Sequence, residues 1–222
     1  PTREPPAPVG VERIPTEVRE ALNFDREQEK TKQDSLMSMF NDEQMEVFTE
    51  INESVMKNEG KCFHLKGAGG CGKTTLATAL LHAARSRGDI AIACASSGIA
   101  ATLLPKGQTA HSAFKIPVQG LDPDSTCKVG GLFGRAELLR QVKFVVWDEV
   151  FMTHRYGFEA VARLIQHLRD NNKLMFGGCT LLTLGDLRQT LPVVTNGGSR
   201  IKIVSACLTR SKLWKCFKQI KL

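Results

Sequence analysis

A phosphate-binding loop between a strand and a helix constrains this chain more than any other feature of its sequence. Residues 67–74 read Gly-Ala-Gly-Gly-Cys-Gly-Lys-Thr, the complete G-x-x-x-x-G-K-[ST] pattern. The short apolar run at 62–65 suits a buried strand, and residues 75–81 suit a helix. A glycine-rich turn at a helix N-terminus points backbone N–H groups at an anion. The pattern predicts a nucleotide-binding loop; the alternative is a glycine-rich turn that happens to end in Lys-Thr.

The residue types in this loop suit separate roles in phosphate binding. Lys73 would reach the β- and γ-phosphates of a nucleotide, and the Thr74 hydroxyl would hold Mg²⁺. The residues expected to contact the nucleotide are Gly67, Gly69, Gly70, Cys71, Gly72, Lys73, Thr74 and Thr75.

The charge of the chain is divided unevenly along its length. Residues 1–60 contain 7 Lys/Arg and 14 Asp/Glu, a net of −7, whereas residues 61–222 contain 23 and 9, a net of +14. The part that holds the loop is therefore basic. This favours a polyanionic partner, with nucleic acid as the first candidate; the alternative is a merely soluble surface.

The cysteines and the apolar runs exclude several classes of protein. The seven cysteines are odd in number and include no C-x-x-C pair, so we expect neither a zinc ribbon nor a disulfide framework. A reduced intracellular compartment fits this pattern best. No apolar run approaches the roughly 20 residues of a membrane span, so we expect no membrane partner.

Proline content and apolar pattern divide the chain into two parts. Five of the nine prolines lie in residues 1–15 and a charged run follows at 25–34, so residues 1–35 are predicted to form a flexible or peripheral arm. Residues 36–222 are predicted to form one α/β domain with a parallel sheet and helices on both faces, because near-continuous apolar strands alternate with helices. The expected strands are 62–65, 90–95, 144–147, 181–184 and 201–204, and the expected helices are 17–22, 41–56, 73–87, 99–104, 136–140 and 158–169.

Two further groups of polar residues follow expected strands. Asp148 and Glu149 come directly after the apolar run 144–147, and at the carboxyl end of a strand they would face the phosphate loop. Asp148 suits Mg²⁺, and Glu149 suits the activation of an attacking water. Gln189 lies just past the strand at 181–184, where it would hydrogen-bond the γ-phosphate or the attacking water; the alternative is an ordinary polar loop.

Two small polar clusters follow other strands and suit contact with a phosphodiester backbone. Residues 96–101 place small hydroxyl residues and a glycine at a helix start, and residues 109–114 offer donors and one aromatic ring. For each cluster the alternative is an ordinary strand-to-helix turn. The expected DNA contacts are Ser96, Ser97, Gly98, Thr109, His111 and Ser112.

Taken in order along the chain, these residues resemble the Pif-type (petite integration frequency) DNA helicases of superfamily 1, in the Helitron-like branch of rolling-circle transposon helicases. The similarity runs from about Phe40 to the C-terminus. The chain departs from the usual pattern at Leu184, Leu187 and Thr190. The matching motifs are 40–44 (Phe-Asn-Asp-Glu-Gln), 67–74, 96–101, 109–112, 148–149, 185–193 and 211–214 (Ser-Lys-Leu-Trp).

The resemblance implies a RecA-like P-loop NTPase domain that binds ATP and Mg²⁺ and acts on single-stranded DNA. It implies that Gln44 reads the adenine edge and that Thr74 and Asp148 share Mg²⁺. Gln189 would link the γ-phosphate to the DNA-side motifs. The expected catalytic residues are Lys73, Glu149 and Gln189.

The function that the resemblance implies is that of an ATP-dependent, 5′-to-3′ DNA helicase in DNA repair, recombination and telomere maintenance. We expect a nuclear location, with the mitochondrion as the alternative. The family has a second RecA-like domain, and we expect this 222-residue chain to be a fragment that holds only the first and has low activity alone.

Other classes of function stay open at this point. One is a non-enzymatic nucleotide- or DNA-binding module left by truncation. A GTPase is disfavoured because the chain has no Asn-Lys-x-Asp motif, and a small-molecule kinase is disfavoured because Glu149 suits water activation.

Overall fold

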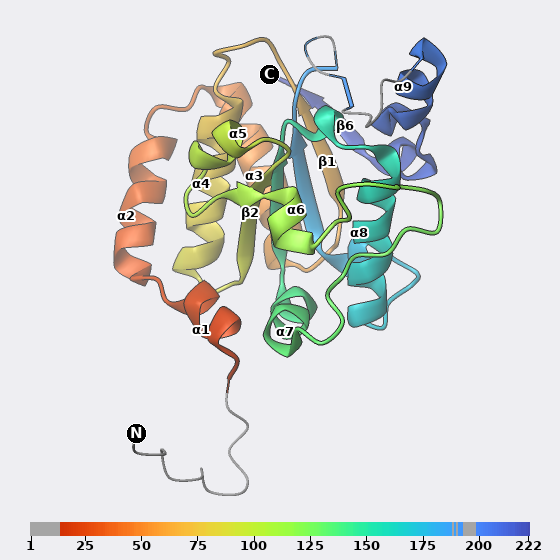
Figure 1. Ribbon diagram of the computed structural model, residues 1–222. Helices are drawn as coiled ribbons and strands as arrows, with labels where there is room; N and C mark the ends of the chain where they lie inside the picture. The colour runs from red at the N-terminus through yellow and green to blue at the C-terminus, as the bar shows by residue number, and fades with distance from the viewer. Residues whose placement is uncertain (1–13, 188, 190, 193–198) are drawn as a thin grey trace, which may run out of the picture.

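The centre of the structure is a six-stranded, fully parallel sheet with the strand order β3-β2-β4-β5-β1-β6 (Figure 1). This computed structural model describes residues 14–187, 189, 191–192 and 199–222. The register aligns Ala95 with Asp148 and Leu65 with Leu184, so the carboxyl ends of the strands meet at one edge. The strands are β1 (Cys62–Lys66), β2 (Ala91–Ala95), β3 (Gln108–Thr109), β4 (Phe144–Asp148), β5 (Thr180–Leu184) and β6 (Lys218–Lys221).

Helices cover both faces of the sheet, which confirms the predicted α/β architecture (Figure 1). Side chains cap the first turn of α2, α3, α5, α6, α8 and α9, whereas α1, α4 and α7 have no side-chain cap. Asn41 Oδ1 accepts from Gln44 N at 2.8 Å and Gln44 Oε1 accepts from Asn41 N at 3.1 Å, which is a capping box. The α-helices are α1 (Thr16–Leu22), α2 (Arg26–Met37), α3 (Asp42–Met56), α4 (Lys73–Ser86), α5 (Gly98–Thr102), α6 (Ala110–Phe114), α7 (Phe133–Gln141), α8 (Arg155–Leu168) and α9 (Arg200–Ala206), and the 3-10 helices are η1 (Val150–Met152), η2 (Met175–Gly178), η3 (Leu208–Arg210) and η4 (Lys212–Cys216).

The alternation of side chains along β4 divides the core into two layers. Phe144 and Val146 belong to the layer with α3 and α4, whereas Trp147 belongs to the layer with α6, α7 and α8. The Trp147 ring stacks on Phe114 with the centroids 5.4 Å apart and lies 5.2 Å from Phe158. Because both faces of β4 are buried, the strand reads as a continuous apolar run in the sequence.

The N-terminal segment contains two helices that pack on the domain. The predicted helix at 17–22 is observed as α1, which lies against α7. The charged run at 25–34 forms α2 because the Asp25 carboxylate caps its first turn, and α2 lies along α4. This part of the expected arm, 1–35, is therefore a packed layer, and residues 1–13 lie outside the described residues.

A buried glutamate–histidine pair holds α2 against α4. His82 Nδ1 lies 2.7 Å from Glu29 Oε2, and both side chains are buried. Lys32 adds a second contact to Glu29 at 3.2 Å. Burial raises the pKa of the Glu29 carboxyl, but the hydrogen bonds from His82 and Lys32 outweigh it, so the pKa lies below its ordinary value.

The C-terminal part of the sheet differs from the prediction. Residues 201–204, expected as a strand, belong to α9, whose Ile201 is 80% exposed and does not enter the core. The last strand is instead β6, an edge strand that is mostly exposed and lacks an apolar pattern. The short β3 was also not predicted, because two residues carry no periodicity. In the part of the chain that the structure describes, no helix is both long and apolar enough to cross a membrane.

We predict that His82→Ala lowers the free energy of unfolding by about 3 kcal/mol, because it leaves the buried Glu29 carboxylate without its closest partner. Lys32→Ala is the control and should cost less than about 1 kcal/mol, since its ammonium is half-exposed. Urea titration measures both values. Equal effects of the two substitutions would contradict the importance of the buried pair.

The same pair sets a pH dependence. Because the folded pKa of Glu29 is depressed, its contribution is fully present above the unfolded pKa of about 4.3 and is lost as the pH falls through the lower folded value. The stability difference between wild type and Glu29→Gln should therefore shrink only below about pH 4.

Candidate nucleotide-binding site

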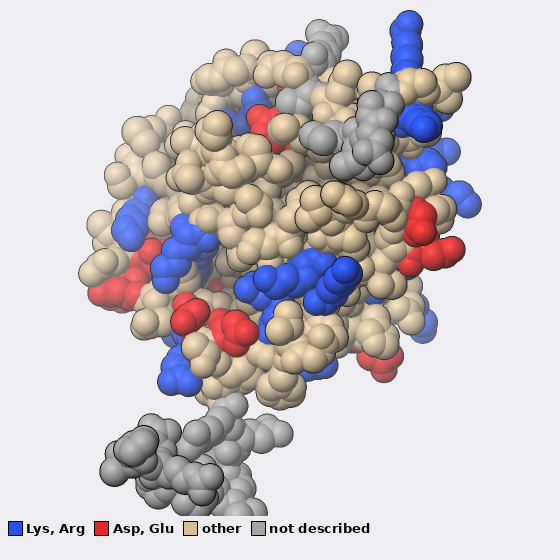
Figure 2. Space-filling view, viewed as in Figure 1, with Lys and Arg blue, Asp and Glu red and all other residues tan. Residues whose placement is uncertain are grey.

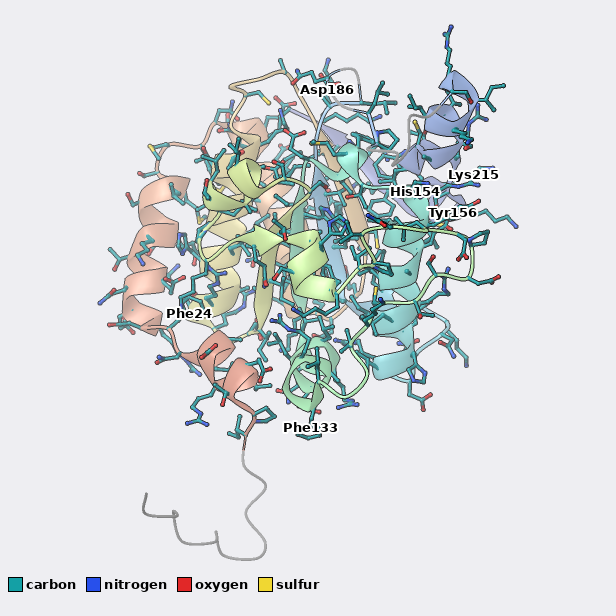
Figure 3. The ribbon with its side chains drawn as sticks, viewed as in Figure 1. Phe24, Phe133, His154, Tyr156, Asp186 and Lys215 are labelled. Atoms are coloured by element: carbon teal, nitrogen blue, oxygen red, sulfur yellow. The ribbon has the colours of Figure 1, made fainter. Side chains whose placement is uncertain are left out.

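Three loops meet at the carboxyl edge of the sheet. They follow β1, β5 and β4, and β5 lies between the other two strands. Burial raises the pKa of both Asp148 and Glu149, and the charge of Lys73 opposes this rise in both, so the Lys73 ammonium lies near the two carboxyl groups. A Cβ on Gly185 would touch the Glu149 backbone. Figure 3 shows Asp186, next to Gly185, at this same edge. The structure thus brings together the loops predicted to bind and hydrolyse a nucleotide.

The phosphate loop depends on its glycines. Gly70 and Gly72 have φ values of 81° and 87°, which lie in the left-handed region that favours glycine. A Cβ on Gly67 would collide with the Cys71 sulfur. The Lys73 ammonium donates to the carbonyl oxygens of Gly67 and Ala68, each at 2.7 Å, so it lies across the mouth of the loop. The loop therefore has the open backbone and the single cation that phosphate binding requires.

Gln44 connects α3 to this loop. Its Nε2 donates to the Cys71 carbonyl at 3.2 Å, while its Oε1 takes part in the capping box. Gly72 is required here as well, since a Cβ at that position would meet Gln44 Nε2. The structure places Gln44 beside the loop, and its expected contact with adenine stays a prediction, because both amide atoms already have protein partners.

The two carboxylates at the end of β4, those of Asp148 and Glu149, are partly shielded from water. Asp148 is buried and its Oδ1 accepts from Glu149 N at 2.7 Å. Burial raises the pKa of both carboxyl groups, and the negative charges of Asp148 and Asp186 raise the pKa of Glu149 further. Glu149 also has a φ of 50°, an uncommon value for a residue with a Cβ and one that recurs at functional sites. A carboxylate with a raised pKa is a stronger base, which suits the predicted role of Glu149.

Gln189 lies in the loop after β5. Its Nε2 donates to Asp186 Oδ2 at 3.2 Å, and the side chain is exposed. The structure describes two of the three residues that depart from the family pattern. Leu184 is fully buried in the core, and Leu187 is 42% exposed. Thr190, the third, lies outside the described residues. The expected contact of Gln189 with the γ-phosphate stays a prediction.

The predicted DNA contacts have structural roles in addition. Ser97 accepts from Ala100 N at 3.2 Å and caps α5, and Thr109 accepts from Ser112 N at 3.2 Å and caps α6. The Ser96 hydroxyl already has a partner within the protein, because Trp147 Nε1 donates to it at 3.1 Å. The exposed members of the set are Gly98 and Ser112, and His111 is half-buried, with its pKa lowered by burial.

Sequence reasoning missed the first turn of α8, which lies beside these clusters. Thr153 Oγ1 is 2.7 Å from Ser96 Oγ, and His154, Arg155 and Tyr156 follow it. The signal was present in the sequence, because a histidine, an arginine and the only tyrosine of the chain come shortly after the acidic pair.

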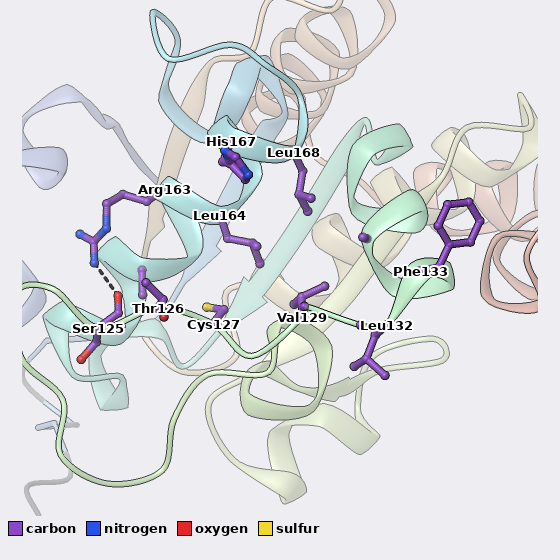
Figure 4. Close-up of a pocket in the computed structure, with 14 residues that line it drawn as sticks. Ser125, Thr126, Cys127, Val129, Leu132, Phe133, Arg163, Leu164, His167 and Leu168 are labelled. Atoms are coloured by element: carbon purple, nitrogen blue, oxygen red, sulfur yellow. Dashed lines mark hydrogen bonds between the residues drawn. The ribbon is translucent and has the colours of Figure 1, made fainter.

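Two hollows differ in their relation to the site. A cavity of about 740 Å³ borders the phosphate loop and the loop after β5, with Gly67, Asp186 and Trp214 in its lining and His64 in its wall. Burial lowers the pKa of His64 to about 4, so its ring is neutral at pH 7. A second, mostly apolar cavity of about 670 Å³ lies between the segment 125–133 and α8 (Figure 4). It contains no residue of the three loops, so we do not assign the chemistry to it.

Comparison with known proteins agrees with this geometry. The model of the PIF1-like helicase family matches residues 39–222. The chain is 31% identical over 141 residues to ATP-dependent DNA helicase Pif1 of Psychrobacter sp. (strain PRwf-1), covering 63% of this chain and 21% of that protein. It is 29% identical over 148 residues to ATP-dependent DNA helicase PIF4 of Trypanosoma brucei brucei, covering 62% and 17%.

Solved structures of Pif1 helicases have the same fold. The Bacteroides Pif1 helicase in complex with ADP-AlF3 and ssDNA matches with a TM-score of 0.65 and 26% identity, over 80% of this chain and 41% of that chain. The Candida albicans Pif1 helicase matches with a TM-score of 0.65 and 24% identity, over 83% and 40%. The chain therefore spans about a fifth of the curated relatives and about two-fifths of the solved ones.

We predict that Lys73→Ala weakens binding of a fluorescent ATP analogue by more than about tenfold, because a hydrogen bond to a charged group contributes about 1.5–3 kcal/mol. Lys66→Ala is the matched control: it removes the same charge from the exposed end of β1 and should leave affinity nearly unchanged. Equal affinities of wild type and Lys73→Ala would show that the nucleotide binds elsewhere.

Proposed function

We propose that this chain, which belongs to the PIF1-like helicase family, is the nucleotide-binding and hydrolysing domain of an ATP-dependent DNA helicase. The observation that carries the proposal is the meeting of Lys73, Asp148 and Glu149 at one edge of a parallel sheet. The structure of a relative that is described as a complex with ADP-AlF3 and ssDNA supports both nucleotide and single-stranded DNA as partners.

Thr74 and Asp148 fit the magnesium ion that such a site implies. Hydroxyl and carboxylate oxygens are ligands that Mg²⁺ prefers, and Mg²⁺ bound with nucleotide phosphates needs only one or two protein ligands. In keeping with this, no group of three or more His, Cys, Asp or Glu residues in the described part of the chain could hold a metal ion by itself. When bound, Mg²⁺ neutralises charge on the β- and γ-phosphates.

The residues of the chain divide the chemistry between them. Lys73, now bonded to two carbonyl oxygens of the loop, would exchange these for phosphate oxygens. Glu149 would take the proton of the attacking water, and because burial and the charge of Asp148 raise the pKa of its carboxyl, it is a stronger base than an exposed glutamate. Gln189, whose side chain donates to Asp186, would exchange this hydrogen bond for one to the γ-phosphate or the attacking water.

The finer parts of the proposal rest on family membership. We infer translocation in the 5′-to-3′ direction on single-stranded DNA, with roles in DNA repair, recombination and telomere maintenance and a nuclear location. The second candidate is a module that binds nucleotide without turnover. An arginine supplied to the transferring phosphate can contribute about 10³–10⁵ in rate, so binding and hydrolysis are separable properties.

We predict that Glu149→Gln retains ATP binding but lowers ATP hydrolysis by about 10²–10⁴-fold, because the substitution keeps the shape and removes the base. Glu46→Gln, on the exposed side of α3, is the control and should have no effect. Unchanged hydrolysis in Glu149→Gln would disprove the assignment of the base. Binding without hydrolysis in wild type would favour the second candidate.

The pH profile gives a second readout of the same residue. Since burial and the charge of Asp148 raise the pKa of Glu149, wild-type hydrolysis should fall on the acid side at a pH above the ordinary glutamate value. The small residual hydrolysis of Glu149→Gln should lack this acid limb.

We predict that single-stranded DNA binds with a steep salt dependence, because each neutralised phosphate adds a slope of about −0.7 to log K against log salt. His111→Ala should lower affinity without changing this slope, since burial lowers the pKa of His111 and its ring is neutral at pH 7. Fluorescence anisotropy with a short labelled oligonucleotide measures both. If His111→Ala lowers thermal stability but not affinity, the residue is structural.

A further inference from the structure

The end of the chain carries positive charge that is mostly uncompensated. Residues 187–222 contain eight Lys/Arg and no Asp/Glu. Figure 2 shows Lys and Arg gathered at the upper right, over α9. Among the described basic residues of this segment, only Lys218 makes an ion pair with a described carboxylate, that of Glu50. The described ones are Arg200, Lys202, Arg210, Lys212, Lys215, Lys218 and Lys221.

Three arginines line one hollow in this region. It has a volume of about 500 Å³, it lies between the first turn of α8, α9 and η3, and its lining contains no carboxylate. The residues that line it are Arg155, Arg200, Ile201, Val204, Ser205 and Arg210. Guanidinium groups match the geometry of phosphate oxygens, so the hollow is suited to a phosphate-bearing ligand.

Arg155 is held in place by the protein rather than by a carboxylate. One terminal nitrogen donates to the Tyr156 hydroxyl at 2.7 Å, and the other donates to the Arg210 carbonyl at 3.4 Å. Its guanidinium carbon lies 4.6 Å from the centre of the Tyr156 ring. Within the described chain it forms no ion pair, and its Nε is buried without a hydrogen-bond partner. The charge is therefore fixed in position and available to an anion.

The start of α8 packs against the segments that carry the predicted DNA contacts. Thr153, two residues before Arg155, lies 2.7 Å from the Ser96 hydroxyl. Gly157 packs on Ile116, which follows α6 and its cap Thr109. The start of α8 thus lies next to both clusters. The carboxylate of Glu159, one turn further along α8, accepts from the Ser211 hydroxyl at 2.6 Å and is therefore engaged within the protein.

Aromatic rings at the start of α8 add a second element of recognition. The His154 and Tyr156 rings lie 5.1 Å apart and both are half-buried (Figure 3). Proteins bind single strands by combining a positive track with rings on which bases stack, each worth about 1–3 kcal/mol. A duplex presents its bases inside, so it would not use these rings.

We propose that Arg155, Tyr156, Arg200 and Arg210, here named the α8–α9 surface, bind the backbone and a base of single-stranded DNA that continues beyond the Ser97 and Thr109 clusters. This proposal rests on the proposed function, and it gives single-stranded DNA a second binding surface on the domain. The arginines of the hollow hold successive phosphates, and Tyr156 stacks a base.

The test uses the double variant Arg200→Gln/Arg210→Gln and a labelled oligothymidylate. Removing two phosphate contacts should lower affinity at low salt and reduce the salt slope by about 1.4. The control Arg163→Gln/Lys173→Gln removes the same charge from the second half of α8 and the segment that follows it, and should leave the slope unchanged. Tyr156→Leu should lower affinity at constant slope, and Tyr156→Phe, which keeps the ring, should restore most of it.

Binding of the fluorescent ATP analogue in each variant shows that the domain is folded. If the double arginine variant keeps the wild-type affinity and salt slope while His111→Ala lowers the affinity, the α8–α9 surface does not bind DNA, but the proposed DNA function is retained. If wild type binds no oligonucleotide at low salt, the DNA function itself fails. A larger loss for duplex than for single strands would overturn the choice of single-stranded DNA.

Discussion

The parallel pairing of β1, β5 and β4 is the constraint on which the rest of the structure depends. Parallel neighbours need a crossover, and each crossover returns the chain so that all carboxyl ends lie at one edge. Lys73, Glu149 and Gln189 are far apart in the sequence, yet each follows one of these strands. β4 and β5 are buried on both faces. Any shift of their register would therefore separate large side chains such as Trp147 from the residues on which they pack. The core therefore fixes the positions of the strand ends from which the three loops begin.

Trp147 joins the nucleotide side of this edge to the DNA side. Its ring packs between Phe114 and Phe158, and its Nε1 donates to Ser96 at the end of β2. The same strand ends one residue later in the carboxylates, so helices α6 and α8 rest on the strand that carries the proposed base. A movement of β4 would consequently shift α6 and α8, which carry residues predicted or proposed to contact DNA. Whether the two sides are energetically coupled is what a double-mutant cycle across Trp147 measures.

The sequence predicted those elements whose pattern arises from burial or backbone conformation. Continuous apolar runs identified four of the strands, and the glycines of the phosphate loop indicated a backbone that side chains would block. Prediction failed where burial is one-sided or small: β6 is an exposed edge strand, and the apolar residues at 201–204 lie on the surface of α9. The packing of α2 also escaped it, because the contact depends on the buried pair of Glu29 and His82, 53 residues apart, which no local pattern reveals.

The position of Gln44 shows how closely the expected base-reading residue is tied to phosphate binding. Its two amide atoms bond the start of α3 and the Cys71 carbonyl, and Gly72 leaves room for its Nε2. An adenine edge that bonded the Gln44 amide would replace these two hydrogen bonds, and because Gln44 is half-buried, water can satisfy only part of its amide in the exchange. Recognition of the base at Gln44 would then release a hydrogen bond to the backbone of the phosphate loop itself. If Gln44 binds the base, the identity of the base and the conformation of the phosphate loop would be parts of one equilibrium.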